Sequence, residues 1–339
     1  MKKLKKLLFV IFICTSLTTN LIPVPGNKDQ FSYQTVYADT GSSLPLIHDC
    51  HKVDYMSYIP EIKCSKTVQK ALNIKNCSMS LDASSAILMK ADGDVLYYKN
   101  PTTAIFPAST AKLLSSLVIL DWCKTNEKVT VGSEVKLIAS DSSKAGIMQG
   151  QKLEVGTLLE AMLLPSGNDA AYAAATYVGR KSLGKGKWSA ITAVKEFSRL
   201  MNKKAQEMGA ENSCFISPDG YDAIGQYTTA YDMGKIAIAA VKSETISSIT
   251  QKSSVSATLL SGEKRFWKNS NALIRNDSNF YNPNVIGLKT GTTTMAGSCL
   301  VAAARSEKGT VISVVMHSSS LGRWDDSNKL LEYGLKQLD

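Results

Sequence analysis

The stretch PASTAK at residues 107–112 runs directly into LLSSLVILDW at residues 113–122, and the interpretation of the whole sequence starts from this junction. Its apolar residues recur at helical spacing, so the sequence predicts a helix from Lys112 to Trp122 with Ser109 at its entrance. Lys112 then lies one turn beyond Ser109 on the same face. A serine hydroxyl needs a base to become a good nucleophile, and a lysine made neutral by burial or by a second cation can be that base.

The serine–lysine spacing alone is weak support for catalysis, because it occurs four times in the chain. Only Ser109 stands between a proline and an apolar helix, where the core can fix its side chain. We interpret the other three occurrences as ordinary surface pairs. They are Ser133/Lys136, Ser182/Lys185 and Ser261/Lys264.

A second element, Ser166-Gly167-Asn168, lies in a break between two predicted helices and is the only Ser-x-Asn in the chain. A hydroxyl and an amide two residues apart can face one cleft, where Ser166 relays protons and Asn168 holds a carbonyl or the lysine. Serine and asparagine are also common helix caps, so this element alone is more typical of a capped turn.

A third element, Lys289-Thr290-Gly291-Thr292, lies at the end of a predicted edge strand. In that position Lys289 is expected to project a cation into the cleft, and Gly291 is expected to leave space for a substrate beside the strand. Thr292 offers both a hydroxyl and a backbone N–H group. Taken alone, the element is a strand end followed by a loop.

The remaining sequence predicts strands near both ends of the chain and helices between them. The strands at 85–91 and 95–99 are joined by DGD at 92–94, a strong hairpin signal. This order favours an α/β fold of the α+β type, in which helices and a mainly helical subdomain flank a central antiparallel sheet that joins both ends of the chain. The other predicted strands span 255–260, 287–290, 298–305 and 310–317, and the predicted helices span 112–122, 157–164, 169–178, 190–208, 228–241 and 326–338.

The three elements, in this order, match the signature of the serine penicillin-recognising enzymes. Over residues 80–339 the sequence resembles the low-molecular-weight D-alanyl-D-alanine carboxypeptidases, which implies a β-lactamase-like fold. Further stretches that match this family are DGDVLY at 92–97, PSGNDAA at 165–171, MNKKA at 201–205, PDG at 218–220, TAYD at 229–232, GLKTG at 287–291, Ala296-Gly297 and Arg323.

The resemblance implies a role for each residue of the three elements. Ser109 would attack the carbonyl of a penultimate D-Ala, with Lys112 as general base, while Ser166 and Asn168 relay protons and hold the substrate. The backbone N–H groups of Ser109 and Thr292 would form the oxyanion hole. The residues expected to bind the substrate and its terminal carboxylate are Lys289, Thr290, Gly291, Thr292 and Arg323.

The activity implied is that of a serine-type D-Ala-D-Ala carboxypeptidase acting on peptidoglycan stem peptides, with β-lactam antibiotics as covalent inhibitors and with no metal or cofactor. A carboxylate-binding set favours this activity over that of a DD-endopeptidase, since a free carboxylate marks a chain end. A class A β-lactamase needs a Glu-x-x-Leu-Asn element, and EFSRL at 196–200 does not fit it. The remaining alternative is a non-catalytic wall-binding protein with the same fold.

The sequence departs from the family in two ways. Asn269-Ser270-Asn271 stands where the family often has Asn-Arg-Asn, which removes an arginine from the site, although Arg275 is close in sequence. The β-rich C-terminal domain and the terminal anchoring helix of the family are not expected, because the sequence stops just after the predicted closing helix.

The N-terminal residues predict export. Four lysines precede the apolar run at 7–13, so residues 1–38 are interpreted as a signal peptide with an uncertain cleavage site, and an uncleaved membrane anchor is the alternative. Residues 39–80 form an irregular segment that contains cysteines, and residues 81–339 form the catalytic domain. We expect the protein outside the cell, at the wall or the outer face of the cytoplasmic membrane.

Composition narrows the partners further. The chain carries a formal net charge of +10, and residues 39–339 keep 34 basic and 28 acidic residues, which suits peripheral association with an anionic wall or membrane surface. No dense basic block with interleaved aromatic residues is present, so nucleic-acid binding is not expected. His48, Cys50 and His51 lack a second pair of metal ligands and are interpreted as a loop. Disulfides are possible in an exported chain, but spacing leaves their pairing open among Cys50, Cys64, Cys77, Cys123, Cys214 and Cys299.

Overall fold

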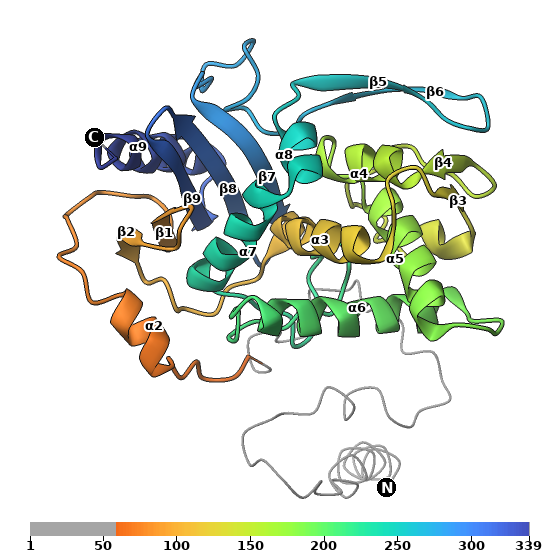
Figure 1. Ribbon diagram of the computed structural model, residues 1–339, viewed down its shortest axis with the longest axis horizontal. Helices are drawn as coiled ribbons and strands as arrows, with labels where there is room; N and C mark the ends of the chain where they lie inside the picture. The colour runs from red at the N-terminus through yellow and green to blue at the C-terminus, as the bar shows by residue number, and fades with distance from the viewer. Residues whose placement is uncertain (1–58, 339) are drawn as a thin grey trace, which may run out of the picture. The chain divides into compact units, whose positions relative to one another are not determined.

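A five-stranded antiparallel sheet forms the centre of the computed structural model, which describes residues 59–338 (Figure 1). The strand order is β2-β1-β9-β8-β7, so the first hairpin of the chain pairs directly with one of the last strands. This confirms the predicted α+β class and the predicted sheet that joins both ends of the chain. The strands are β1 (Ser85–Lys90), β2 (Val95–Lys99), β7 (Val285–Thr293), β8 (Gly297–Ser306) and β9 (Gly309–Ser318).

Helices cover both faces of this sheet. Helix α9 (Gly322–Lys336) packs on β9, β8 and β1 and buries Leu330 and Leu331 against one face. Helix α7 (Ala230–Lys242) contacts β9 and β1, and α8 (Glu244–Thr250) contacts β7 (Figure 1). The strands between the two layers are buried on both faces, so they read as apolar runs rather than as alternating patterns.

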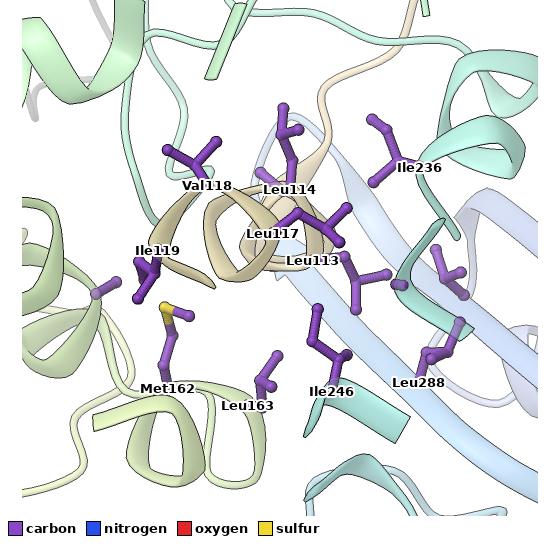
Figure 2. Close-up of a cluster of buried hydrophobic side chains, with 14 of the residues drawn as sticks. Leu113, Leu114, Leu117, Val118, Ile119, Met162, Leu163, Ile236, Ile246 and Leu288 are labelled. Atoms are coloured by element: carbon purple, nitrogen blue, oxygen red, sulfur yellow. The ribbon is translucent and has the colours of Figure 1, made fainter. Parts of the chain in front are cut away.

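Helix α3 (Lys112–Trp122) is the buried centre of the helical region. Every residue from Lys112 to Ile119 is buried. Figure 2 shows apolar side chains of α3 surrounded by those of other elements, including Met162, Ile246 and Leu288. The neighbouring helices are α4 (Val155–Leu163), α5 (Asn168–Leu183) and α6 (Ala190–Glu207). A helix packed on all sides has little freedom to move, so the residue at its first position is held firmly.

Several short elements are absent from the sequence prediction. Strands β3 (Lys128–Thr130) and β4 (Lys152–Glu154) form a two-stranded sheet of only three residue pairs, too short to leave a periodic pattern. The predicted strand at 255–260 is β5 (Ser254–Thr258), which pairs with β6 (Lys264–Lys268) in a separate hairpin rather than in the central sheet. Strand β6, KRFWK, was not predicted because four of its five residues are not buried.

The N-terminal predictions are only partly within the described residues. The proposed signal peptide at 1–38 and the sites His48, Cys50 and His51 lie outside them. From residue 59 onward the irregular segment contains one short helix, α2 (Lys66–Ala71), which Ser65 caps. Within residues 59–338 no helix is long and apolar enough to cross a bilayer, and no cluster of three metal-ligating side chains occurs. Cys64, Cys77, Cys123 and Cys299 are free thiols.

Candidate active site

The serine and the lysine of the first element are in direct contact. Ser109 lies in the 3-10 turn η2 (Ala108–Ala111), which leads into α3 at Lys112. The Lys112 Nζ atom donates a hydrogen bond to Ser109 Oγ at 2.7 Å. Ala108 has a φ of +47°, an unusual conformation for a residue other than glycine, and Ser109 remains partly exposed beside it. The turn therefore leaves the Ser109 residue partly exposed to solvent while its hydroxyl contacts the buried Lys112 amino group.

The amino group of Lys112 is enclosed by acceptors. Besides Ser109, it donates to Asn168 Oδ1 at 2.7 Å and to the backbone carbonyl of Asp219 at 3.0 Å. Burial lowers the pKa of Lys112 to about 8, although the carboxylates of Asp219 and Asp169 act in the opposite direction. A substantial neutral fraction near pH 8 is what a general base of this type needs.

The second element forms a tight bend between α4 and α5. Ser166 is buried and has a φ of +65°, and Asn168 begins α5 with its side chain on Lys112. Gly167 is required between them, because an added Cβ would lie 2.6 Å from the Ala145 Cβ and 2.8 Å from the Ala161 carbonyl oxygen. The close approach of those neighbours fixes the direction in which Asn168 points.

Strand β7 brings the third element against the nucleophile turn. Gly291 faces η2 so closely that an added Cβ would lie 2.9 Å from Ala108 Cβ and 3.0 Å from the Ser109 nitrogen. The room that this glycine leaves is thus filled by the turn that carries Ser109. The sequence predicts that this room serves a substrate, whereas in the structure the absence of a Cβ at Gly291 lets the strand and the turn meet.

The sequence predicts that Lys289 projects a cation into the cleft, but in the structure this lysine is buried. It is fully buried, and its Nζ donates to the carbonyl of Thr290 at 2.9 Å. Burial lowers the pKa of Lys289 well below the ordinary lysine value, and the charges of Lys112 and Arg323 lower it further. Because the repulsion between two buried amines is mutual, the pair resists holding two protons at once.

Arg323 reaches the exposed end of the third element from the first turn of α9. Its Nη1 donates to Thr292 Oγ1 at 2.8 Å and to the Gly291 carbonyl at 3.3 Å, and its guanidinium lies 4.3 Å from the centre of the Trp324 ring. Burial lowers the pKa of Arg323, but an arginine remains charged in proteins. Stacking holds the guanidinium in place with donors to spare, as a carboxylate-binding group requires.

The residues at 269–271 replace the missing arginine with a hydroxyl contact. Ser270 Oγ lies 2.7 Å from Thr290 Oγ1, so the serine contacts the third element, a role that the sequence analysis does not predict. Arg275 forms an ion pair with Asp277 instead, with 3.7 Å between Arg275 Nε and Asp277 Oδ1. Asp219, whose carbonyl holds Lys112, was missed as well, and the PDG match at 218–220 was the available signal.

Comparison with known proteins gives a consistent result. The family described as D-alanyl-D-alanine carboxypeptidase matches residues 70–320. The D-alanyl-D-alanine carboxypeptidase of Streptomyces sp. (strain K15) is 34% identical over 252 residues, which cover 71% of this chain and 83% of the relative. D-alanyl-D-alanine carboxypeptidase DacF of Bacillus subtilis (strain 168) is 31% identical over 274 residues, which cover 78% of this chain and 65% of the relative. The chain thus spans just under two thirds of the length of that second relative.

Solved structures show the same fold. The Streptomyces K15 DD-transpeptidase superposes with a TM-score of 0.69 at 31% identity, covering 77% of this chain and 99% of that one. D-alanyl-D-alanine carboxypeptidase DacD from Francisella tularensis gives a TM-score of 0.65 at 25% identity, covering 78% of this chain and 73% of that one. The predicted serine penicillin-recognising fold is therefore confirmed.

Proposed function

The chain belongs to the D-alanyl-D-alanine carboxypeptidase family, and from that premise we propose that it is a serine hydrolase that removes the terminal D-alanine from peptidoglycan stem peptides. The observation that carries the proposal is the Ser109–Lys112–Asn168 contact, with the Lys112 pKa lowered to about 8 beside a partly exposed hydroxyl. A structural lysine would instead be paired with a carboxylate. Here all three acceptors of its hydrogen bonds are uncharged groups.

The proposed acylation step uses these groups in sequence. Lys112 takes the proton of Ser109 Oγ, and the oxygen attacks the carbonyl carbon of the penultimate D-Ala. The charge that develops on the carbonyl oxygen is held by the backbone N–H groups of Ser109 and Thr292. The C–N bond then breaks, and the departing D-alanine nitrogen receives a proton from Lys112, with Ser166 as relay. An ester between the substrate and Ser109 remains.

Deacylation reverses the roles. A water molecule gives a proton to Lys112 and attacks the ester carbonyl, and the proton passes back to Ser109 Oγ as the shortened peptide leaves. A β-lactam follows the first half of this path: its ring amide opens on Ser109, and the ring nitrogen receives the proton. Because the cleaved amine stays tethered to the acyl group, we expect slow hydrolysis and covalent inhibition.

Recognition of a chain end is assigned to β7 and α9. Strand β7 offers the hydroxyls of Thr290 and Thr292 to a terminal carboxylate, and α9 offers the guanidinium of Arg323, which contacts Thr292. The buried Lys289 directly precedes Thr290 on β7 and donates to its carbonyl at 2.9 Å. This set favours a carboxypeptidase over a DD-endopeptidase, a β-lactamase or a non-catalytic wall-binding protein. We propose that the protein acts outside the cell, in peripheral contact with the anionic wall or membrane surface.

The test is release of D-alanine from a tripeptide that ends in Lys-D-Ala-D-Ala. We expect release by the full chain and none by Ser109→Ala, with one penicillin bound covalently per wild-type chain and none per variant by mass spectrometry. Release that persists in Ser109→Ala removes the serine from the mechanism. A folded wild-type chain that neither releases D-alanine nor binds penicillin rules the whole proposal out.

Transpeptidation is a second candidate that the comparisons favour, because the Streptomyces relative is described both as a carboxypeptidase and as a DD-transpeptidase. The two reactions share the acyl-enzyme and differ in whether water or an amine accepts it. Adding a free amino acid as acceptor and separating the products by mass distinguishes them. Transfer product in excess of hydrolysed product would make this chain a transpeptidase.

A further inference from the structure

The loop at residues 218–222 lies outside the three sequence elements and contacts both Lys112 and the turn η2 that carries Ser109. The carbonyl of Asp219 accepts the hydrogen bond of Lys112 at 3.0 Å. Gly220, with a φ of +78°, packs so tightly on η2 that an added Cβ would lie 1.8 Å from the carbonyl oxygen of Ala108. The loop is therefore fixed relative to both the base and the nucleophile turn.

Asp222, the last residue of this loop, reaches across to the hairpin between β7 and β8. Its Oδ1 accepts a hydrogen bond from Thr293 Oγ1 at 2.7 Å, and its Oδ2 accepts one from the Met295 N–H at 3.1 Å. Thr293 Oγ1 in turn accepts from the Ala296 N–H at 3.0 Å. Only 8% of Asp222 is exposed, so both carboxylate oxygens are committed to the turn of the hairpin. A buried carboxylate is costly unless it is hydrogen-bonded, so Asp222 favours the turn conformation in which Thr293 and Met295 both donate to it.

Strand β7 needs an external support at this end. Among the strands of residues 59–338 it pairs with β8 alone and so forms an edge of the sheet, and Thr292 is exposed where the hairpin begins to turn. Arg323 holds the Thr292 side chain from α9. Asp222 holds the next residue, Thr293, from the 218–222 loop. The backbone of Thr292 is thus fixed between two side chains that come from different elements.

We propose that Asp222 is a positioning residue, which sets the backbone N–H of Thr292 relative to Ser109 through Thr293. The inference rests on the proposed function, in which that N–H stabilises the oxyanion. A displacement well under 1 Å is enough to weaken such a donor, because oxyanion stabilisation depends on preorganised geometry. Asp222 touches neither substrate nor the reacting atoms in this scheme, and its effect passes through the turn.

The electrostatic surroundings of Asp222 are consistent with this role. Burial raises its pKa, and the nearby carboxylates of Asp141 and Asp219 raise it further, whereas the hydrogen bonds from Thr293 and Met295 lower it. The two donors on the turn therefore act against the unfavourable burial of the charge. Burying the Asp222 carboxylate is unfavourable, and the hydrogen bonds that compensate for it form only when the turn has its native conformation.

The experiment compares paired variants on the full chain. Asp222→Ala and Thr293→Val are expected to lower kcat for the tripeptide and the second-order rate of penicillin acylation by about ten- to a hundredfold, with KM changed by less than about threefold. Thr293→Ser keeps the hydroxyl and is expected to retain wild-type rates within about threefold. This rescue separates the hydrogen bond from general packing.

A matched control comes from a second buried carboxylate. Asp232 Oδ2 accepts hydrogen bonds from Ser213 Oγ at 2.7 Å and the Asn212 N–H at 2.7 Å, well removed in sequence from β7. Ser213→Ala removes a comparable hydroxyl bond and is expected to lower Tm without a selective fall in kcat. If Asp222→Ala does not fold, Thr293→Val against Thr293→Ser still decides the matter.

Three outcomes overturn the inference. They are unchanged rates in a folded Thr293→Val, a rise in KM alone, and an equal fall in kcat for Ser213→Ala. Penicillin acylation keeps this test separate from the proposed function. If the wild-type chain is acylated by penicillin but releases no D-alanine, the proposed substrate is wrong. The effect of Asp222 on the position of Thr292 can still be measured through the rate of penicillin acylation.

Discussion

At the scale of single residues, the environment of Lys112 differs sharply from that of a lysine in water. Its amino group is buried, faces three uncharged acceptors and has a pKa of about 8. The sequence predicted the contact with Ser109 from a spacing of three residues. It could not predict the Asp219 carbonyl, because that contact spans 107 positions and involves a backbone atom.

The lowered pKa of Lys112 predicts how acylation depends on pH. Only the neutral amine accepts a proton, so the second-order rate of penicillin acylation should rise about tenfold per pH unit below about 8 and level off above it. Stopped-flow measurement with a fluorescent penicillin between pH 6 and 9 tests this. Penicillin hydrolysis without protein is the blank at each pH. A rate that does not change across this range would remove Lys112 as the base.

The same group affects stability with a definite sign. The unfolded chain, with an ordinary lysine pKa of about 10.4, binds more protons than the folded chain between pH 8 and that value. Through this group, the free energy of unfolding therefore increases as pH rises across the window and is lowest below it. The site is thus maintained at the expense of stability near neutral pH.

Gly167 gives a residue-scale prediction about stability. Gly167→Ala forces a Cβ to within 2.8 Å of the Ala161 carbonyl oxygen, so we expect a loss of about 1–3 kcal/mol in the free energy of unfolding. Urea unfolding measures it. The control is Gly156→Ala in α4, whose added Cβ would lie 3.4 Å from its nearest neighbour and should be nearly neutral. Equal effects at the two positions would show that the bend is not tightly constrained.

At the scale of elements, segments with a clear apolar pattern and a turn or cap signal were predicted well, whereas α5 (Asn168–Leu183), predicted at 169–178, ends five residues later than predicted. Helices α3 and α6 and the β1–β2 hairpin appear within a residue or two of the predicted bounds, because each carries its own apolar pattern and its own turn or cap signal. Helix α9 begins at Gly322, four residues before the predicted start, because this end carries no sequence signal for a helix: Leu321 at the N-cap offers no capping side chain, and the first helical residue is a glycine. That first turn carries Arg323.

Arg323 therefore gives an element-scale prediction about specificity. Arg323→Ala should lower kcat/KM for a peptide with a free terminal carboxylate by about ten- to a hundredfold and leave the corresponding C-terminal amide almost unchanged. The ratio of the two kcat/KM values is the measurement. Arg275→Ala serves as control, since that arginine lies beside Asp277 and not on β7. If the ratio survives in Arg323→Ala, another group reads the carboxylate.

At the scale of the whole molecule, the segments that form the site could be predicted from the sequence, but the contacts between these segments could not. Motif order placed Ser109, Asn168 and Lys289 in one cleft by resemblance, and the structure brings their segments together. The contacts that connect these segments are those of Asp222 with Thr293, of Ser270 with Thr290, and of Gly291 with η2. These are contacts between segments far apart in the chain, which no local pattern encodes.

The central place of β1 has a consequence for the order of events during synthesis. This strand lies between β2 and β9, so a segment made early stays without one of its partners until residue 318 has been made. Arg323 follows only five positions later. We therefore expect a growing or truncated chain to hold Ser109 in an unassembled site and not to react with penicillin. Labelling by the antibiotic should then count finished molecules, and a pulse-chase experiment should time the last step of folding rather than the synthesis of Ser109.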